Sequence, residues 1–187
     1  RLCVYELATG KKNYVSEKFD SSVEGFVWNK DNKSLSFIGV WHGTLNLYQA
    51  NFKGEVKQIT NEWADYGSIS LANNGNKLLA TKASMSHPTD IYIVTPGKDA
   101  KSTKVEQITR ENDHILNQLN LGKCEQRWVK TTDGKQMLVW IMLPSNFDAN
   151  KKYPTLLFCE GGPQSPVSQF WSYRWNIQIM AANDYII

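Results

Sequence analysis

The feature of this sequence that most restricts its fold is a repeated pair of short strands in the first two thirds of the chain. Each copy has an alternating apolar segment around a tyrosine, a turn containing glycine, and a second short segment. The repeated tyrosines lie 43 and 44 residues apart, at Tyr5, Tyr48 and Tyr92. The tripeptide QIT recurs at 58–60 and 107–109. A period of this length is typical of the blades of a β-propeller.

Two further segments, 23–40 and 66–83, lie between these copies, and each has the pattern strand, turn, strand. Their turns are rich in Asn and Gly, which accept the positive φ of tight hairpins. The sequence thus predicts a mainly β chain with four short strands per unit, and a plain antiparallel meander or sandwich is the alternative. About two and a half units fit into residues 1–117, fewer than the roughly four to eight blades of a closed ring. We therefore expect an incomplete propeller, within a chain that is an internal piece of a longer protein.

From residue 118 the pattern changes to that of an α/β unit. The dipeptide Asp133-Gly134 between two apolar runs predicts a β-hairpin. The continuous apolar run TLLFC at 155–159 predicts a strand covered on both faces, with Cys159 as a buried small residue. The apolar spacing over residues 170–180 predicts an amphipathic helix, and YII at 185–187 predicts the start of a further strand. Strand, glycine-containing loop, helix and strand in this order begin an α/β unit.

The charges and the cysteines argue against several kinds of partner and cofactor. The net charge of the 187 residues is +3 without a basic stripe, so no nucleic-acid partner is expected. The three cysteines have no CxxC spacing and are odd in number, which predicts neither a metal site nor a complete disulfide framework. None of the three histidines has the i, i+4 partner of a metal motif, and no metal is expected. No apolar run is long enough to span a bilayer.

The repeats, followed by DGK, LP and YPTLLFCEGGPQSP, resemble the prolyl oligopeptidase family of serine peptidases, in particular its bacterial dipeptidyl-peptidase and acyl-aminoacyl-peptidase-like branch. The resemblance spans the whole chain, and its most specific parts are 132–144 and 153–163. It implies that residues 1–117 are the C-terminal blades of a propeller. Residues 118–187 would then be the first strands and the first helix of an α/β-hydrolase domain.

The resemblance also assigns a role to the glycines after the apolar run. In α/β-hydrolases this loop supplies part of the oxyanion hole, so Glu160, Gly161 and Gly162 are expected to line the substrate site. Glycine has no Cβ and lets a substrate carbonyl come close, although the residues alone also allow a simple strand-end turn. Three polar residues further along are candidates either for the substrate approach or for a structural role: Ser165, Ser168 and Gln169.

Glu160 departs from the family pattern, which has a tyrosine at this position. An ionised glutamate can only accept hydrogen bonds, so its side chain is not expected to donate to an oxyanion. It is expected instead to hold a substrate ammonium group, to pair with a basic residue elsewhere, or to buttress the loop.

No G-x-S-x-G sequence occurs in the chain, and the family places Ser, Asp and His in that order after the last strand seen here. No catalytic residue is therefore expected within residues 1–187, and this piece alone is expected to be inactive. For the longer protein the resemblance implies a serine exopeptidase that releases dipeptides from the N-terminus of short peptides through an acyl-enzyme, without a cofactor. The alternatives are a propeller binding or scaffold module, and an esterase or inactive relative.

The expected partners are peptide substrates and the remainder of the same polypeptide, and homo-oligomerisation is left open. The resemblance favours the periplasm or another exported location, with the cytoplasm as the alternative.

Overall fold

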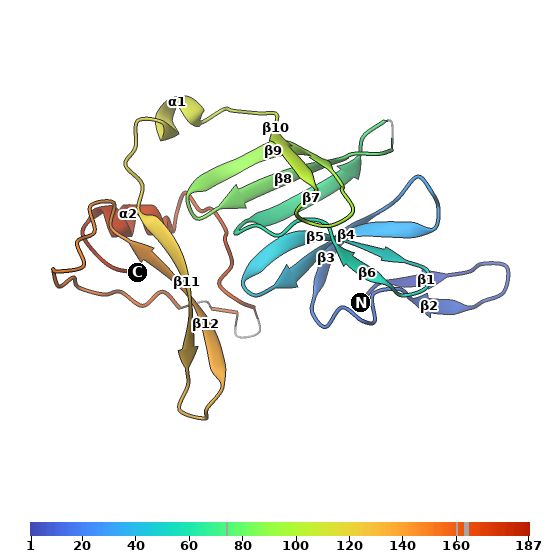
Figure 1. Cartoon of the computed structure of the whole chain (residues 1–187), viewed down its shortest axis with the longest axis horizontal. Helices are drawn as coiled ribbons and strands as arrows, with labels where there is room; N and C mark the ends of the chain where they lie inside the picture. Colours follow the sequence, from blue (N-terminus) through green and yellow to red (C-terminus); the bar gives the residue numbers. More distant parts are fainter. Residues whose placement is uncertain (74, 160, 163–164) are drawn as a thin grey trace.

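The computed structural model describes residues 1–73, 75–159, 161–162 and 165–187 (Figure 1). Most of its strands belong to two antiparallel meanders of four strands each. The first contains β3 (Val23–Trp28), β4 (Ser34–Trp41), β5 (Thr44–Asn51) and β6 (Val56–Gln58). The second contains β7 (Asp65–Leu71), β8 (Leu78–Ser84), β9 (His87–Thr95) and β10 (Lys104–Gln107). The hairpin β1 (Cys3–Tyr5) and β2 (Lys12–Tyr14) precedes them. The predicted four strands per unit are confirmed.

The two meanders repeat each other in register and in their closing hydrogen bonds. β6 pairs Gln58 with Tyr48, and β10 pairs Gln107 with Tyr92. The threonine of each QIT tripeptide then accepts a hydrogen bond from the backbone N–H of the residue before that tyrosine, at 2.9 Å in both units. A side-chain acceptor thus takes the place of a ladder carbonyl where each outer strand ends.

The first hairpin follows the same rule with a different alignment from the predicted one. Ser16 Oγ accepts from the backbone N–H of Leu2 at 2.7 Å, and Cys3 pairs with Tyr14. Cys3, rather than Tyr5, is therefore the counterpart of Tyr48 and Tyr92. The alignment on Tyr5 was wrong because the repeated element is the closing hydroxyl bond, not the aromatic side chain.

The core lies between the sheets, because β4 and β5 are covered on both faces. Successive residues of a strand point to opposite faces. Phe37 and its partner Tyr48 therefore pack toward the first hairpin, while Ile38 and its partner Leu47 pack toward the second meander. All four side chains are buried. Face-to-face packing of twisted four-stranded sheets is how neighbouring propeller blades form a core.

Buried tyrosines make the stability of this core decrease at alkaline pH. Burial raises the pKa of Tyr48 to about 12. In Tyr66 burial, together with the nearby Glu62 carboxylate, also raises the pKa. In the unfolded chain a tyrosine has a pKa of about 10, so the unfolded state loses these protons first. The stability that depends on them is complete below pH 10 and is lost as the pH rises toward 12.

We therefore expect the thermal unfolding midpoint of the protein to fall between about pH 10 and pH 12, and a Tyr48→Phe variant to show a shallower fall. The measurement is circular dichroism against temperature at a series of pH values. A variant with an unchanged slope would contradict the assignment to Tyr48.

The Asp133-Gly134 hairpin is confirmed. It joins β11 (Lys123–Lys130) to β12 (Gln136–Leu143), which are antiparallel along their full lengths, and Gly134 adopts a φ of 84°. A positive φ of this kind is what glycine supplies in tight turns. The hairpin tip projects away from the other elements (Figure 1). A short helix, α1 (Asp113–Leu116), lies in the connection from the second meander and was not predicted.

The last residues of the chain lie between β12 and the residues around Thr155. Ile187 exchanges two backbone hydrogen bonds with Met142 of β12, at 2.9 and 3.0 Å. On its other side, Ile186 forms a parallel bridge to Thr155, with backbone bonds to Pro154 and Leu156. The backbone order is therefore β11, β12, 186–187 and 154–156, so the last segment in the chain is inserted between two earlier ones. The predicted further strand at YII is present as this bridge.

The strand predicted at 155–159 is wrong in extent. Within the described residues, Ile186 is the only residue whose backbone pairs with this segment, and the pairing is limited to Thr155 and its neighbours. Leu157 is 85% exposed, and Cys159 is exposed rather than buried. A strand covered on both faces needs neighbours that these residues do not provide.

The predicted helix over 170–180 begins later, as α2 (Ile177–Ala182). Asn176 caps it by accepting from the backbone N–H groups of Gln178 and Ile179. Before it, Ser172 Oγ accepts from the backbone N–H groups of Arg174 and Trp175 and holds a non-helical turn. Serine and asparagine compete in this way with the helix for backbone donors.

Among the described residues, no helix is long and apolar enough to cross a membrane.

Candidate active-site loop

The glycine loop follows the segment bridged to Ile186. Gly161 and Gly162 are both exposed. Beyond them the backbone N–H of Ser165 donates to the carbonyl oxygen of Gly162 at 3.1 Å. Glu160 lies outside the described residues, together with Pro163 and Gln164, so the roles predicted for its side chain stay predictions.

Neither glycine is required by the local packing of the described residues. A Cβ atom added to Gly161 would have no heavy atom within 4 Å, and one added to Gly162 would meet only Ser165 Oγ at 3.4 Å. The φ of Gly162 is not in the left-handed range. Gly43 shows the opposite case, with a φ of +67° and Trp140 Nε1 at 2.7 Å from an added Cβ. Among the described residues, the two loop glycines thus leave open space beside their backbone.

Ser168 and Gln169 contact the propeller. Ser168 Oγ donates to Asp65 Oδ2 at 2.5 Å, and the backbone N–H of Gln169 donates to Asp65 Oδ1 at 3.1 Å. The Gln169 side chain is buried, accepts from the backbone N–H of Met85 and donates to Cys124 Sγ, both at 3.5 Å. Ser165 is exposed. Of the three polar candidates, two therefore join the loop to the blades.

Asp65, a residue that the sequence pattern did not single out, is the centre of this contact. Burial raises the pKa of its carboxyl group, and the bonds from Ser168, from Gln169 and from the backbone of Leu45 act in the opposite direction. A carboxylate largely removed from water is stable only when hydrogen-bond donors replace the lost hydration. The only sequence signal that could have indicated Asp65 is a difference between the two repeated units: an acidic residue follows Trp63-Ala64 where the preceding unit has Ser22.

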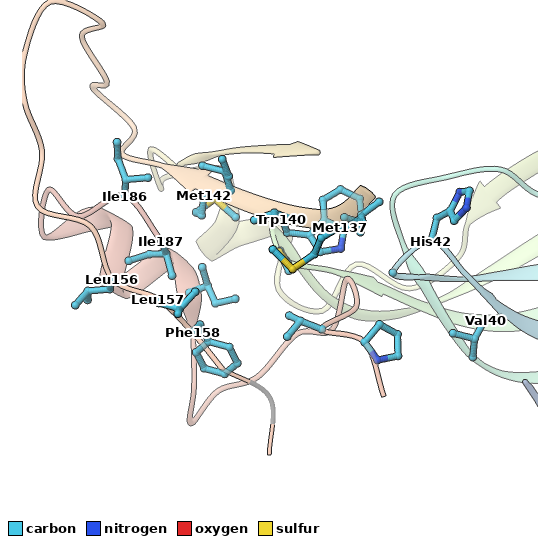
Figure 2. A pocket seen from close by; sticks show the side chains of 18 of the residues that line it. Val40, His42, Met137, Trp140, Met142, Leu156, Leu157, Phe158, Ile186 and Ile187 are labelled. Carbon is cyan, nitrogen blue, oxygen red and sulfur yellow. The ribbon is translucent and has the colours of Figure 1, made fainter. Parts of the chain in front are cut away.

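An apolar cavity of about 660 Å³ adjoins the loop (Figure 2). Leu156, Leu157 and Phe158 line one side, and residues of β12 that include Trp140 and Met142 line another. His42, in the β4–β5 turn, lies at the propeller end. Among the described residues, the lining includes no cysteine, lysine or carboxylate.

In the part of the chain that the structure describes, one group of side chains could hold a metal ion: His87, Asp90 and Asp113, whose ligand atoms lie within 4.8 Å of one another. Each already has a protein partner. Asp90 accepts from Gln107 and Thr109, Asp113 pairs with Arg110 at 3.0 Å, and His87 Nδ1 lies 2.8 Å from the carbonyl oxygen of Pro88. The sequence pattern did not indicate this group because Asp113 comes from α1, far along the chain. The three side chains are accounted for by their contacts within the last blade and the following connection.

Two features together define a class of protein, the α/β-hydrolases that carry a β-propeller: propeller blades, and after them a late segment inserted between earlier ones beside a glycine loop. No protein-family model matches the chain. The sequence is 44% identical to dipeptidyl-peptidase 5 of Porphyromonas gingivalis over 188 residues, which cover 100% of this chain and 27% of that relative.

Two solved structures share the fold. The acylaminoacyl peptidase of Pyrococcus horikoshii superposes with a TM-score of 0.75 at 21% identity, over 95% of this chain and 26% of that one. Dipeptidyl peptidase 4 of Porphyromonas gingivalis gives a TM-score of 0.68 at 17% identity, over 98% and 26%. Over its whole length the chain is thus similar to part of these dipeptidyl and acylaminoacyl peptidases, as expected for a piece of a prolyl oligopeptidase family protein. It spans about a quarter of the length of these relatives.

Proposed function

We propose that this chain is part of a serine exopeptidase that releases dipeptides from the free N-terminus of short peptides. Residues 1–117 would be the last blades of the propeller, and 118–187 the beginning of the peptidase domain. The described strands support this division, because no ladder joins β1–β10 to β11 or β12. The nucleophilic serine, the aspartate and the histidine would follow residue 187 in the order that the fold requires.

The observation that carries the proposal is the pair of glycines that the packing of the described residues does not demand. In an α/β-hydrolase this loop faces the carbonyl that the serine attacks, and its backbone N–H groups stabilise the oxyanion. The serine oxygen bonds to the carbonyl carbon, and its proton passes through the histidine to the leaving amine. Water then cleaves the acyl-enzyme by the same route. The absence of a Cβ at Gly161 would let the substrate carbonyl come close to the loop.

The names of the relatives support the choice of substrate. The relative that covers the whole chain at 44% identity is a dipeptidyl-peptidase. The likeness to an acylaminoacyl peptidase makes removal of a blocked N-terminal residue the second candidate. We also propose an exported location, which cell fractionation would test against a cytoplasmic one.

The test uses the full-length protein, with a fluorophosphonate probe and two substrates, a dipeptidyl amide with a free amine and an acetyl-aminoacyl amide. One probe adduct per chain and release of the dipeptide are expected. Hydrolysis of only the acetylated substrate would favour the second candidate. A protein that neither binds the probe nor cleaves either amide would be a scaffold or an inactive relative, and one that cleaves only simple esters would be an esterase.

A further inference from the structure

The contact between Asp65 and residues 168–169 is placed where it can control the glycine loop. Asp65 begins β7, and its backbone pairs with Ala83 of β8 and with Leu45 of β5. It therefore stands where the two meanders meet, and three strands hold it. Its neighbours Ala64 and Tyr66 are buried. The side chain of Asp65 consequently projects from one of the most constrained positions in the blades.

Both carboxylate oxygens of Asp65 accept hydrogen bonds from the dipeptide Ser168-Gln169, which lies more than a hundred residues further along the chain. Oδ2 accepts from the hydroxyl of Ser168 and Oδ1 from the backbone N–H of Gln169. Two bonds to adjacent residues fix orientation as well as distance, and bonds to an ionised acceptor are roughly twice as strong as neutral ones. The Gln169 side chain extends this contact to Met85, in the β8–β9 turn, and to Cys124 of β11. We call Asp65, Ser168 and Gln169 the loop anchor.

The blade repeat does not need an acidic residue at this place. The two meanders can be aligned on the backbone hydrogen bonds that close the β3–β4 and β7–β8 hairpins. In the first, Asn29 N–H donates to the carbonyl oxygen of Ser34, and in the second, Ala72 N–H donates to that of Lys77. In this alignment the counterpart of Asp65 is Ser22, a short neutral residue. A desolvated carboxylate costs free energy that the first meander avoids. The carboxylate has one donor within the blades, the backbone of Leu45, and its other two donors, Ser168 and Gln169, come from beyond the glycine loop.

The loop is held at both ends, but by different parts of the molecule. Before the glycines, Leu156 is bonded to Ile186 at 2.9 Å. After them, the backbone N–H of Ser165 donates to the carbonyl oxygen of Gly162, and three residues later the hydroxyl of Ser168 donates to Asp65. The first attachment belongs to the sheet with β12, and the second belongs to the propeller. Loss of the loop anchor would free only the second end.

We propose that Asp65 is a positioning residue for the peptidase reaction. Through Ser168 and Gln169, this propeller residue sets the position of the backbone at Gly161 and Gly162. The inference rests on the proposed function for its catalytic consequence, whereas the positioning of the loop can be measured without turnover. Displacement of a catalytic group by about 1 Å costs on the order of 100-fold in rate. The anchor therefore contributes to kcat, because it acts on the geometry of the transition state, and contributes little to KM.

The experiment uses the full-length protein and the variants Asp65→Ala, Asp65→Asn, Ser168→Ala and the double variant Asp65→Ala/Ser168→Ala. We expect Asp65→Ala to lower kcat by about 10- to 100-fold with KM changed less than about threefold. Asn keeps one carbonyl acceptor, so Asp65→Asn should fall between the wild type and Asp65→Ala. The double variant should lose no more than Asp65→Ala alone, because both changes break the same contact. Titration with the fluorophosphonate probe gives the concentration of active sites for each variant.

Two controls separate positioning from general effects. Gln178 of α2 also joins the peptidase part to the blades, because its side chain donates to Ser86 Oγ at 2.9 Å. Within the peptidase part it accepts from the backbone N–H of Gly122 at 2.7 Å. Among the described residues, no hydrogen bond of Gln178 involves the loop anchor. Gln178→Ala should lower stability and leave kcat per active site unchanged. Asp90→Asn removes a buried carboxylate from the last blade, at the place where the other meander has Asn46, and should also keep kcat.

Hydrogen exchange gives a readout that does not depend on activity. In Asp65→Ala the amides of Ser165 and of residues 167–169 should lose protection, while those of β7 and β8 keep it. If exchange at 165–169 is unchanged, or if kcat of Asp65→Ala equals that of an active wild type, the proposal is overturned. It is also overturned if Gln178→Ala reproduces the kcat loss, since the contact would then only dock the two parts. An inactive wild type would refute the proposed function, and the exchange result would still decide whether Asp65 positions the loop.

Discussion

Replacing Gly161 with alanine in the full-length protein is expected to lower kcat/KM by about 100-fold without destabilising the fold. Among the described residues, no heavy atom lies within 4 Å of the Cβ that this change adds. At such sites Gly→Ala commonly stabilises a protein by about 0.4–1 kcal/mol, because the unfolded chain loses freedom. In the active enzyme the same methyl group would stand where the substrate carbonyl approaches the loop, and a small displacement there is costly. Steady-state kinetics and thermal unfolding measure the two effects.

Gly25→Ala is the matched control for this change. Gly25 in β3 has no positive φ, and among the described residues an added Cβ would meet only Ile38 Cδ1 at 3.7 Å. Both variants should unfold at or above the wild-type temperature, and only Gly161→Ala should lose activity. Full activity in Gly161→Ala would remove the loop from the substrate site and would favour the simple strand-end turn.

Replacing Phe37 with alanine is expected to lower the free energy of unfolding by about 3–5 kcal/mol. Phe37 is fully buried between the first hairpin and the first meander, with ring centroids 5.3 Å from Phe19 and 5.5 Å from Tyr48. Removal of the ring leaves a cavity in a core that twisted sheets cannot easily close. Urea unfolding followed by tryptophan fluorescence measures the loss.

Phe26→Ala provides the comparison, because Phe26 pairs with Phe37 across the strands but is 53% exposed. We expect it to cost about 1 kcal/mol or less, since half of the ring is already in water. Equal losses in the two variants would contradict the assignment of the core to the space between the sheets.

The elements that the sequence predicted well are those whose signals are local. The strands of the two meanders and the hairpin at Asp133-Gly134 depend on alternation and turn chemistry within about twenty residues. The apolar spacing over 170–180, in contrast, placed the helix too early. Side-chain acceptors at Ser172 and Asn176 decide where α2 begins, and a hydrophobic pattern does not contain that information.

The candidate site shows the same contrast between residues with a local sequence signal and residues whose partners are distant in the chain. The glycines could be identified from the sequence because two adjacent glycines after an apolar run are unusual in either a strand or a simple turn. The roles of Ser168 and Gln169 could not, because their partner is Asp65, which precedes them by more than a hundred residues. The exposure of Cys159 was also not predictable from the run TLLFC, since burial depends on which strands lie beside it.

The insertion of residues 186–187 between β12 and Thr155 has a consequence for the order of folding. Each propeller hairpin closes through contacts near in sequence, which are the fastest to form. The segment before the glycine loop gains its backbone partner only after Ile186 and Ile187 have been synthesised and α2 has brought them back. During translation the blades described here can therefore be complete while this segment is still unpaired. The loop would then acquire its final geometry as a late event, on a propeller surface that is already formed.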